Sequence, residues 1–158
     1  QRITRAIGIT CHADPAALRS ALERHDFDCT QMALNAGLAS MADTDKGMKA
    51  KAAGDSSFEK LALPIAVRKH MGIIAMKVFG QEQLLAAAPV NKLLAYALSL
   101  PVSLASIGMP QFEHIEYNAQ LARSFNPMSN HQRRQLQQSI ATEPKQAMLK
   151  LLENHVDA

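Results

Sequence analysis

The sequence has 158 residues, of which 47% are apolar and 20% charged, and its formal net charge is +3. This size allows one domain with a substantial core, and the composition is typical of a soluble globular chain rather than a disordered one. The apolar runs are too short to span a bilayer, no secretory signal pattern opens the chain, and scattered Lys and Arg without Trp argue against nucleic-acid binding.

Taken in chain order, four short apolar or β-branched runs are expected to form strands, over 6–10, 28–33, 72–79 and 102–107. Between the first two, Asp14 is a natural N-cap and Pro15 suits the first helical position, so a helix is predicted there. The two cysteines, Cys11 and Cys29, lack metal-ligand spacing and are expected to be reduced thiols, which favours a cytoplasmic location.

The polar segment 35–57 exceeds the usual connection length and is expected to form a lid at the end of the second strand. After it, Ser56 and Glu59 predict a capping box that opens a helix over 58–70, with a kink at Pro64. Further helices are expected over 90–100, 111–124 and 131–155, the last divided in two by Pro144.

Alternating strands and helices predict a parallel sheet covered by helices. A doubly wound sheet and part of a (β/α)8 barrel both fit, and in both of them ligands bind at the carboxyl ends of the strands. The chain has neither a GxGxxG motif nor a P-loop, which weakens the doubly wound nucleotide-binding alternative.

The strand ends, read together, carry a resemblance. They are IGITCH at 7–12, QMALN at 31–35, GIIAMKVFG at 72–80 and IGMPQFEHIEYN at 107–118. In this order and at these spacings the chain resembles the second half of the aldo-keto reductases, from Arg5 to about Met128.

This resemblance implies an α/β fold, a (β/α)8 TIM barrel of which residues 1–158 supply strands five to eight as the C-terminal half of a single domain. It implies reduction of an aldehyde or ketone with NADP(H), with NAD(H) left open. The partners implied are a small carbonyl substrate and the missing N-terminal half of the barrel, with no nucleic acid and no membrane.

Several residues are implied to bind the cofactor. Thr10 and Cys11 lie where the family often has a Ser-Asn pair that binds the nicotinamide carboxamide, and Gln31 matches a glutamine that reaches the same amide. Met76 lies where many members stack a Tyr on the nicotinamide ring. The loop near the pyrophosphate would supply Lys77, Val78, Gly80 and Gln81. The adenosine side would supply Gly108, Met109, His114, Tyr117 and Asn118.

Two departures bear on this assignment. Cys11 is a poor replacement for an amide side chain, and His114 stands where many members place an Arg that binds the 2′-phosphate. The missing positive charge could come from Lys77, or from Lys46, Lys49 and Lys51 in the polar segment.

The family's catalytic Asp, Tyr, Lys and His would all precede this sequence, so no catalytic residue is assigned and the chain alone is expected to be inactive. The tyrosines present, Tyr96 and Tyr117, are not placed to protonate a carbonyl. No metal site is expected.

Other interpretations of single residues stay open. Cys11 and His12 could form a nucleophilic pair, although neighbours on a strand face opposite ways, or they could be an inert corner. Gln31 could satisfy a hydrogen bond in the core, and Lys77 could be catalytic rather than phosphate-binding.

At the level of the whole chain, one alternative is a non-catalytic half barrel that pairs with itself or with a complementary chain. Another is an interaction domain on an α/β sheet, against which the scattered charge argues.

Overall fold

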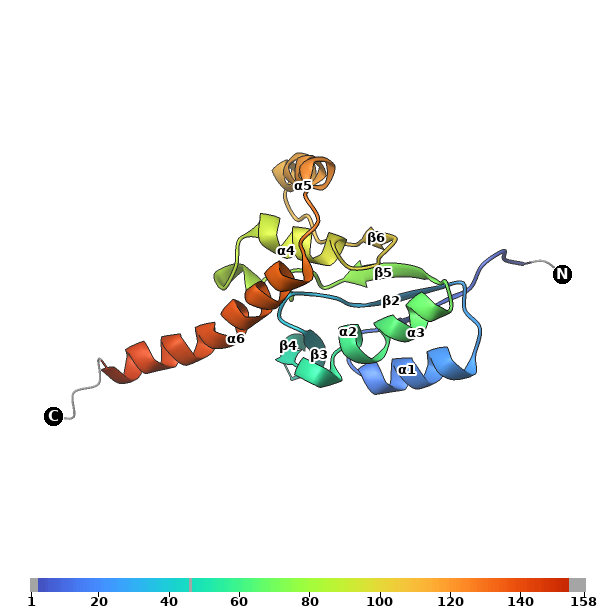
Figure 1. The fold of residues 1–158 in the computed structure, drawn as a ribbon, viewed down its shortest axis with the longest axis horizontal. Coiled ribbons are helices and arrows are strands. Elements are labelled where there is room, and N and C mark those ends of the chain that lie inside the picture. The colour runs from blue at the N-terminus through green and yellow to red at the C-terminus, as the bar shows by residue number, and fades with distance from the viewer. Residues whose placement is uncertain (1–2, 46, 154–158) are drawn as a thin grey trace.

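The computed structural model describes residues 3–45 and 47–153, which form a parallel sheet with helices packed on it (Figure 1). The sheet contains β1 (Gly8–Cys11), β2 (Cys29–Ala33), β5 (Gly72–Met76) and β6 (Leu104–Ala105). The helices are α1 (Pro15–Arg24), α2 (Phe58–Leu61), α3 (Leu63–Arg68), α4 (Val90–Leu98), α5 (Phe112–Ser124) and α6 (Asn130–Glu153). Short 3-10 turns cover Gly54–Ser56 and Gln83–Ala86. None of the helices in this described part is long and apolar enough to cross a lipid bilayer.

The strand order follows the chain: β1-β2-β5-β6, all parallel. Parallel crossovers are right-handed, so an order without reversal places the connecting helices on one face of the sheet. A doubly wound sheet reverses its order and carries helices on both faces. The observed order has no such reversal and therefore favours the barrel alternative.

The two faces of the sheet differ in burial. Met32 and Ile73, which face the helices, are 0% and 3% exposed, and they pack in the core with Leu22 of α1. The opposite face carries the register row Thr10, Gln31, Ile74 and Leu104. Thr10 is exposed and Leu104 is 48% exposed, so the ends of this row are open to solvent.

The predicted start of α1 is confirmed. Oδ1 of Asp14 accepts hydrogen bonds from the backbone N–H groups of Ala16 and Ala17, each at 2.9 Å, and Pro15 is the first helical residue. Such a cap satisfies amides that the first turn leaves without a helical partner. The strand that precedes α1 and the helix itself are thus joined by a short, well-defined corner.

The segment 35–57, expected to be a long polar loop, instead forms an antiparallel hairpin of β3 (Ala39–Thr44) and β4 (Gly47–Ala52), and its expected role as a lid stays a prediction. Asn35, which is 1% exposed, donates from Nδ2 to the carbonyl of Ala39 and accepts from its N–H, both at 3.0 Å. The N–H of Met41 donates to the carbonyl of His12 at 2.9 Å, which fastens the hairpin to the end of β1. Lys46 lies outside the described residues.

Three helix signals had different outcomes. The expected kink at Pro64 is confirmed, since the segment divides into α2 and α3. The capping box is wrong: Ser57 is the N-cap of α2, but its side chain makes no capping hydrogen bond. The division of the last helix at Pro144 is wrong, because α6 runs continuously through Pro144, with good helix formers such as Gln, Leu and Ala on both sides.

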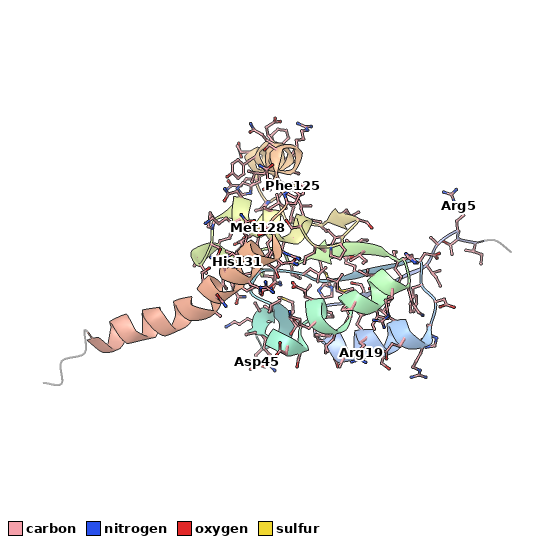
Figure 2. All side chains as sticks on the ribbon, in the orientation of Figure 1. Arg5, Arg19, Asp45, Phe125, Met128 and His131 are labelled. Atoms are coloured by element: carbon pink, nitrogen blue, oxygen red, sulfur yellow. The ribbon has the colours of Figure 1, made fainter. Side chains whose placement is uncertain are left out.

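The connection from α5 to α6 passes beside the C-terminal end of α4. Figure 2 labels Phe125, Met128 and His131 along this path, from α5 at the top of the view to the start of α6. The N–H of Met128 donates to Oγ of Ser99 at 2.7 Å, and Leu136 and Ile140 of α6 are buried in the core. These contacts fix the start of α6 to the body of the domain.

Candidate cofactor-binding site

A cavity of about 550 Å³ lies at the carboxyl ends of the four parallel strands. Its lining comes from the segments that follow β1, β5 and β6, from β2 itself and from α5. The lining residues are His12, Gln31, Met76, Lys77, Val78, Phe79, Gln81, Glu82, Leu85, Val90, Ser106, Ile107, Gly108, Pro110, His114, Tyr117 and Asn118. This volume is in the range of cavities that hold small molecules and cofactors.

At the β1 end, one side chain enters the cavity and its neighbour does not. Cys11 pairs in register with Met32, which is 0% exposed beneath the helices. The thiol of Cys11 donates to the carbonyl of Asp14 at 3.3 Å. His12 lines the cavity, and its Nδ1 is buried without a hydrogen-bond partner. Cys11 and His12 therefore do not form the nucleophilic pair that sequence alone left open.

Gln31 and Met76 line the cavity from the neighbouring strands β2 and β5. Gln31 stands beside Thr10 in the register of the open face and is partly exposed. Met76, the last residue of β5, is 4% exposed, and its carbonyl accepts from the N–H of Leu34 at 3.1 Å. An amide and a polarisable thioether on neighbouring strands offer hydrogen bonding beside an apolar surface.

The segment after β5 has an unusual backbone. Lys77, Gly80, Gln81 and Glu82 all have positive φ, at 56°, 55°, 53° and 70°. Only glycine adopts this region without strain, and strained residues cluster at ligand sites. The N–H of Gly80 donates to the carbonyl of Lys77 at 2.8 Å and closes a tight turn. This turn brings Lys77 and Glu82 to the cavity wall.

α5 closes the far end of the cavity with His114, Tyr117 and Asn118. Asn118 is 6% exposed, and its Oδ1 is buried without a donor. A buried acceptor without a partner costs about 1–3 kcal/mol, so a ligand donor at this point would be stabilised. Tyr117 is 50% exposed and offers an aromatic face at the rim.

Most of the residues implied by the resemblance meet at this cavity. Those that line it are Gln31, Met76, Lys77, Val78, Gln81, Gly108, His114, Tyr117 and Asn118. Thr10, Cys11, Gly80 and Met109 are not among the lining residues, and neither are Lys49 and Lys51 of the hairpin. Cofactor contact by any of these residues stays a prediction.

The sequence interpretation assigned no cofactor contact to several lining residues, namely His12, Phe79, Glu82, Leu85, Val90, Ser106, Ile107 and Pro110. Their common feature is position, because they lie just beyond a strand or at the start of a helix. A rule based on the first residues after each strand would have found His12 and Ser106. Leu85 and Val90 lie too far from a strand end to be found in this way.

Neither a metal site nor a role for Tyr96 in the cavity is supported in the described part of the chain. It contains no group of three or more His, Cys, Asp or Glu side chains placed to hold a metal ion. Tyr96 is fully buried and lies outside the cavity lining.

The lining combines polar groups at separate points of the cavity with one positive charge. His12 and Gln31 supply polar groups near β1 and β2, and Asn118 supplies an unpaired acceptor on α5. Lys77 lies between them and carries the positive charge that a phosphate requires.

Comparisons with known proteins agree with the fold. No family model and no curated protein matches the sequence. Among solved structures, the chain is similar to aldo-keto reductase AKR11C1 from Bacillus halodurans in its holo form, with a TM-score of 0.55 and 12% identity over 84% of this chain and 49% of that chain. For the apo form the TM-score is 0.54, with 13% identity over 84% and 50% of the two chains.

The chain thus spans about half the length of these structures. At such low identity the similarity concerns the fold. The resemblance found in the sequence is confirmed at that level: this is an α/β fold whose parallel sheet resembles part of an aldo-keto reductase.

Proposed function

We propose that this chain is the cofactor-binding, C-terminal half of an aldo-keto reductase-like (β/α)8 barrel. It binds NADP(H), or NAD(H), across the carboxyl ends of its strands. The bound cofactor supplies a hydride for an aldehyde or ketone. The proton donor belongs to residues outside this chain, so the chain alone holds the cofactor without turnover.

The observation that carries the proposal is the cavity itself. It lies where βα-barrels place their ligands, and it extends across the ends of strands that follow one another in sheet order. Its lining combines Gln31 and Met76 at one end with Asn118 at the other.

Exposed apolar side chains support the proposal that this chain packs against the other half of a barrel. Leu104 on the edge strand β6 is 48% exposed, and Phe112 and Ile115 of α5 are 83% and 48% exposed. Exposed apolar groups beside an unpaired strand edge favour association with further structure. In a closed barrel these groups would face the neighbouring βα units.

The direct test is calorimetric titration of the full-length polypeptide with NADPH and NADH, comparing the wild type with Gly108→Leu. A Cβ on Gly108 would meet no atom within 4 Å, and φ there is not positive, so the variant is expected to fold. Its side chain would enter the cavity and lower affinity by at least about tenfold, equivalent to one well-made contact.

Gln120→Leu is the matched control, since Gln120 is an exposed position of α5 outside the cavity lining. It should bind both nucleotides like the wild type. If wild-type protein bound neither nucleotide at millimolar concentration, the proposal would be withdrawn.

A half barrel that pairs with itself is the second candidate, and the same exposed side chains on β6 and α5 favour it. The intact mass of the natural polypeptide discriminates. A mass near twice 17.2 kDa supports the whole-barrel enzyme. A mass of 17.2 kDa with a dimer in sedimentation supports self-pairing.

A further inference from the structure

We infer that His12, rather than Cys11, is the residue of the β1 corner that holds the carboxamide of the nicotinamide ring. This inference rests on the proposed cofactor site and assigns a positioning residue within it. It concerns a place where the chain departs from the pattern that the resemblance implies, because a thiol stands at the expected amide position.

The first step is the orientation of Cys11. Its register partner Met32 and the next residue in that row, Ala75, are both 0% exposed on the helix-covered side of the sheet. Its thiol already donates to the carbonyl of Asp14, at the N-terminus of α1. Contact with a ligand at the strand ends would require this side chain to leave its partner and turn to the other face.

The second step is the state of His12. It lines the cavity, and its Nδ1 is buried without a hydrogen-bond partner in the described structure. A buried imidazole nitrogen without a partner is destabilising, and that cost is recovered when a ligand supplies the hydrogen bond. No protein group in the described part of the chain satisfies the atom when the cavity is empty.

The third step is the fixed backbone at this position. The carbonyl of His12 accepts from the N–H of Met41 in β3 at 2.9 Å, so the hairpin holds the residue from outside the sheet. A side chain on a fixed backbone is a better positioning group than one on a free loop. The hairpin thus has a function at the site although none of its described residues lines the cavity.

The fourth step is chemical. A neutral imidazole offers one donor and one acceptor, and a carboxamide offers both a carbonyl and an NH₂ group. Either tautomer of His12 can therefore pair with it. Gln31 lies on the neighbouring strand β2, where it pairs in register with Thr10, and it can take the remaining group of the same amide. Lys77 and α5 line other parts of the cavity, where the phosphates and the adenosine would lie.

The test compares ligands with and without the nicotinamide ring. Calorimetric titrations of the full-length protein with NADPH and with 2′-phospho-ADP-ribose, or with NADH and ADP-ribose, are made on the wild type, His12→Phe, His12→Asn and Cys11→Ala. His12→Phe should weaken dinucleotide binding about tenfold, while affinity for the ring-free ligand stays within about twofold. His12→Asn restores an amide and should recover most of the loss. Cys11→Ala should change neither affinity by more than about twofold.

Three outcomes would overturn the inference. Equal weakening of both ligands by His12→Phe would make His12 a structural residue. No weakening of either would mean that Nδ1 does not face the ring. A tenfold loss with Cys11→Ala would return the role to Cys11. Wild-type protein that binds none of the ligands would instead overturn the proposed function. Circular dichroism melts verify that each variant is folded.

Discussion

The phenol of Tyr96 donates a 2.5 Å hydrogen bond to Oε2 of Glu59 and thereby joins α4 to α2. Gln137 of α6 donates to the same phenol oxygen, and to Oε1 of Glu59 at 3.4 Å. Tyr96 is 0% exposed, so this polar cluster of three side chains lies inside the helical layer. It connects three helices that are distant in sequence.

Tyr96→Phe should lower the free energy of unfolding by about 1–3 kcal/mol, because it leaves the partly buried Glu59 and Gln137 without their shared partner. Urea denaturation followed by circular dichroism measures the change. Tyr117→Phe is the control, since Tyr117 is 50% exposed and should lose less than about 0.5 kcal/mol. Equal losses in the two variants would contradict the role assigned to the cluster.

The same cluster predicts alkaline instability. Burial, and then the negative charge of Glu59, raise the pKa of Tyr96 far above its ordinary value of 10.0. The unfolded state therefore releases this proton at lower pH than the folded state. The stabilisation is complete below pH 10 and is lost as the pH rises above it.

This pH dependence is measured most cleanly in Tyr117→Phe, in which Tyr96 is the remaining tyrosine. The phenolate absorbance at about 295 nm should appear together with the loss of helical circular dichroism. Phenolate formation in a protein that keeps its helical signal would contradict the prediction.

Gly80→Ala should be destabilising for two reasons. Gly80 has φ of 55°, and an added Cβ would lie 2.9 Å from Cγ of Leu84. Gly54→Ala isolates the first effect, because Gly54 has φ of 52° but open space around its Cβ position. Gly54→Ala should cost about 1 kcal/mol and Gly80→Ala more, as thermal melts would measure. If Gly80→Ala lost less stability than Gly54→Ala, Leu84 would have to move aside without a cost in free energy, and the prediction would be wrong.

Asn35→Ala should loosen the hairpin and the site together. It removes both hydrogen bonds to Ala39, at a position that is 1% exposed, and should cost about 2 kcal/mol or more. Because β3 holds the carbonyl of His12 through Met41, dinucleotide affinity should also fall. Asn91→Ala, at an exposed position, is the control for stability and for affinity. A variant that is destabilised but keeps its dinucleotide affinity would contradict a role of the hairpin at the site.

Local signals in the sequence predicted the sheet and the first helix well. Asp14 and Pro15 determine the start of α1 through the nearest backbone amides, which is a property of a few consecutive residues. The β5 run was predicted to reach Phe79 but ends at Met76, because Lys77 takes a positive φ that no pattern of apolar residues indicates. The hairpin was missed because alanines and lysines are weak strand formers, and the contacts of Asn35 come from tertiary structure.

The candidate site was also predicted only in part, because some of its features depend on tertiary contacts. The strand order predicted that a site would lie at the carboxyl ends of the strands, and the resemblance placed Gln31 and Lys77 in it. The sequence could not predict which of Cys11 and His12 enters the cavity. That depends on the side of the corner to which each side chain points and on the hydrogen bond from Cys11 to Asp14.

The hairpin also has a consequence for how the sheet assembles. Gly8 of β1 pairs with Cys29 of β2, whereas Cys29 pairs on its other side with Gly72 of β5, much further along the chain. The β2–β5 pairing therefore closes the longest loop of the sheet. The hairpin lies inside that loop and pairs residues that are near neighbours, from Thr44 with Gly47 outward to Ala39 with Ala52. Local hairpins form in microseconds, and each shortening of a loop lowers the entropy lost when its ends meet. The β3–β4 hairpin therefore brings the ends of β2 and β5 closer together in the unfolded chain, and its early formation should speed the step that joins the two halves of the sheet.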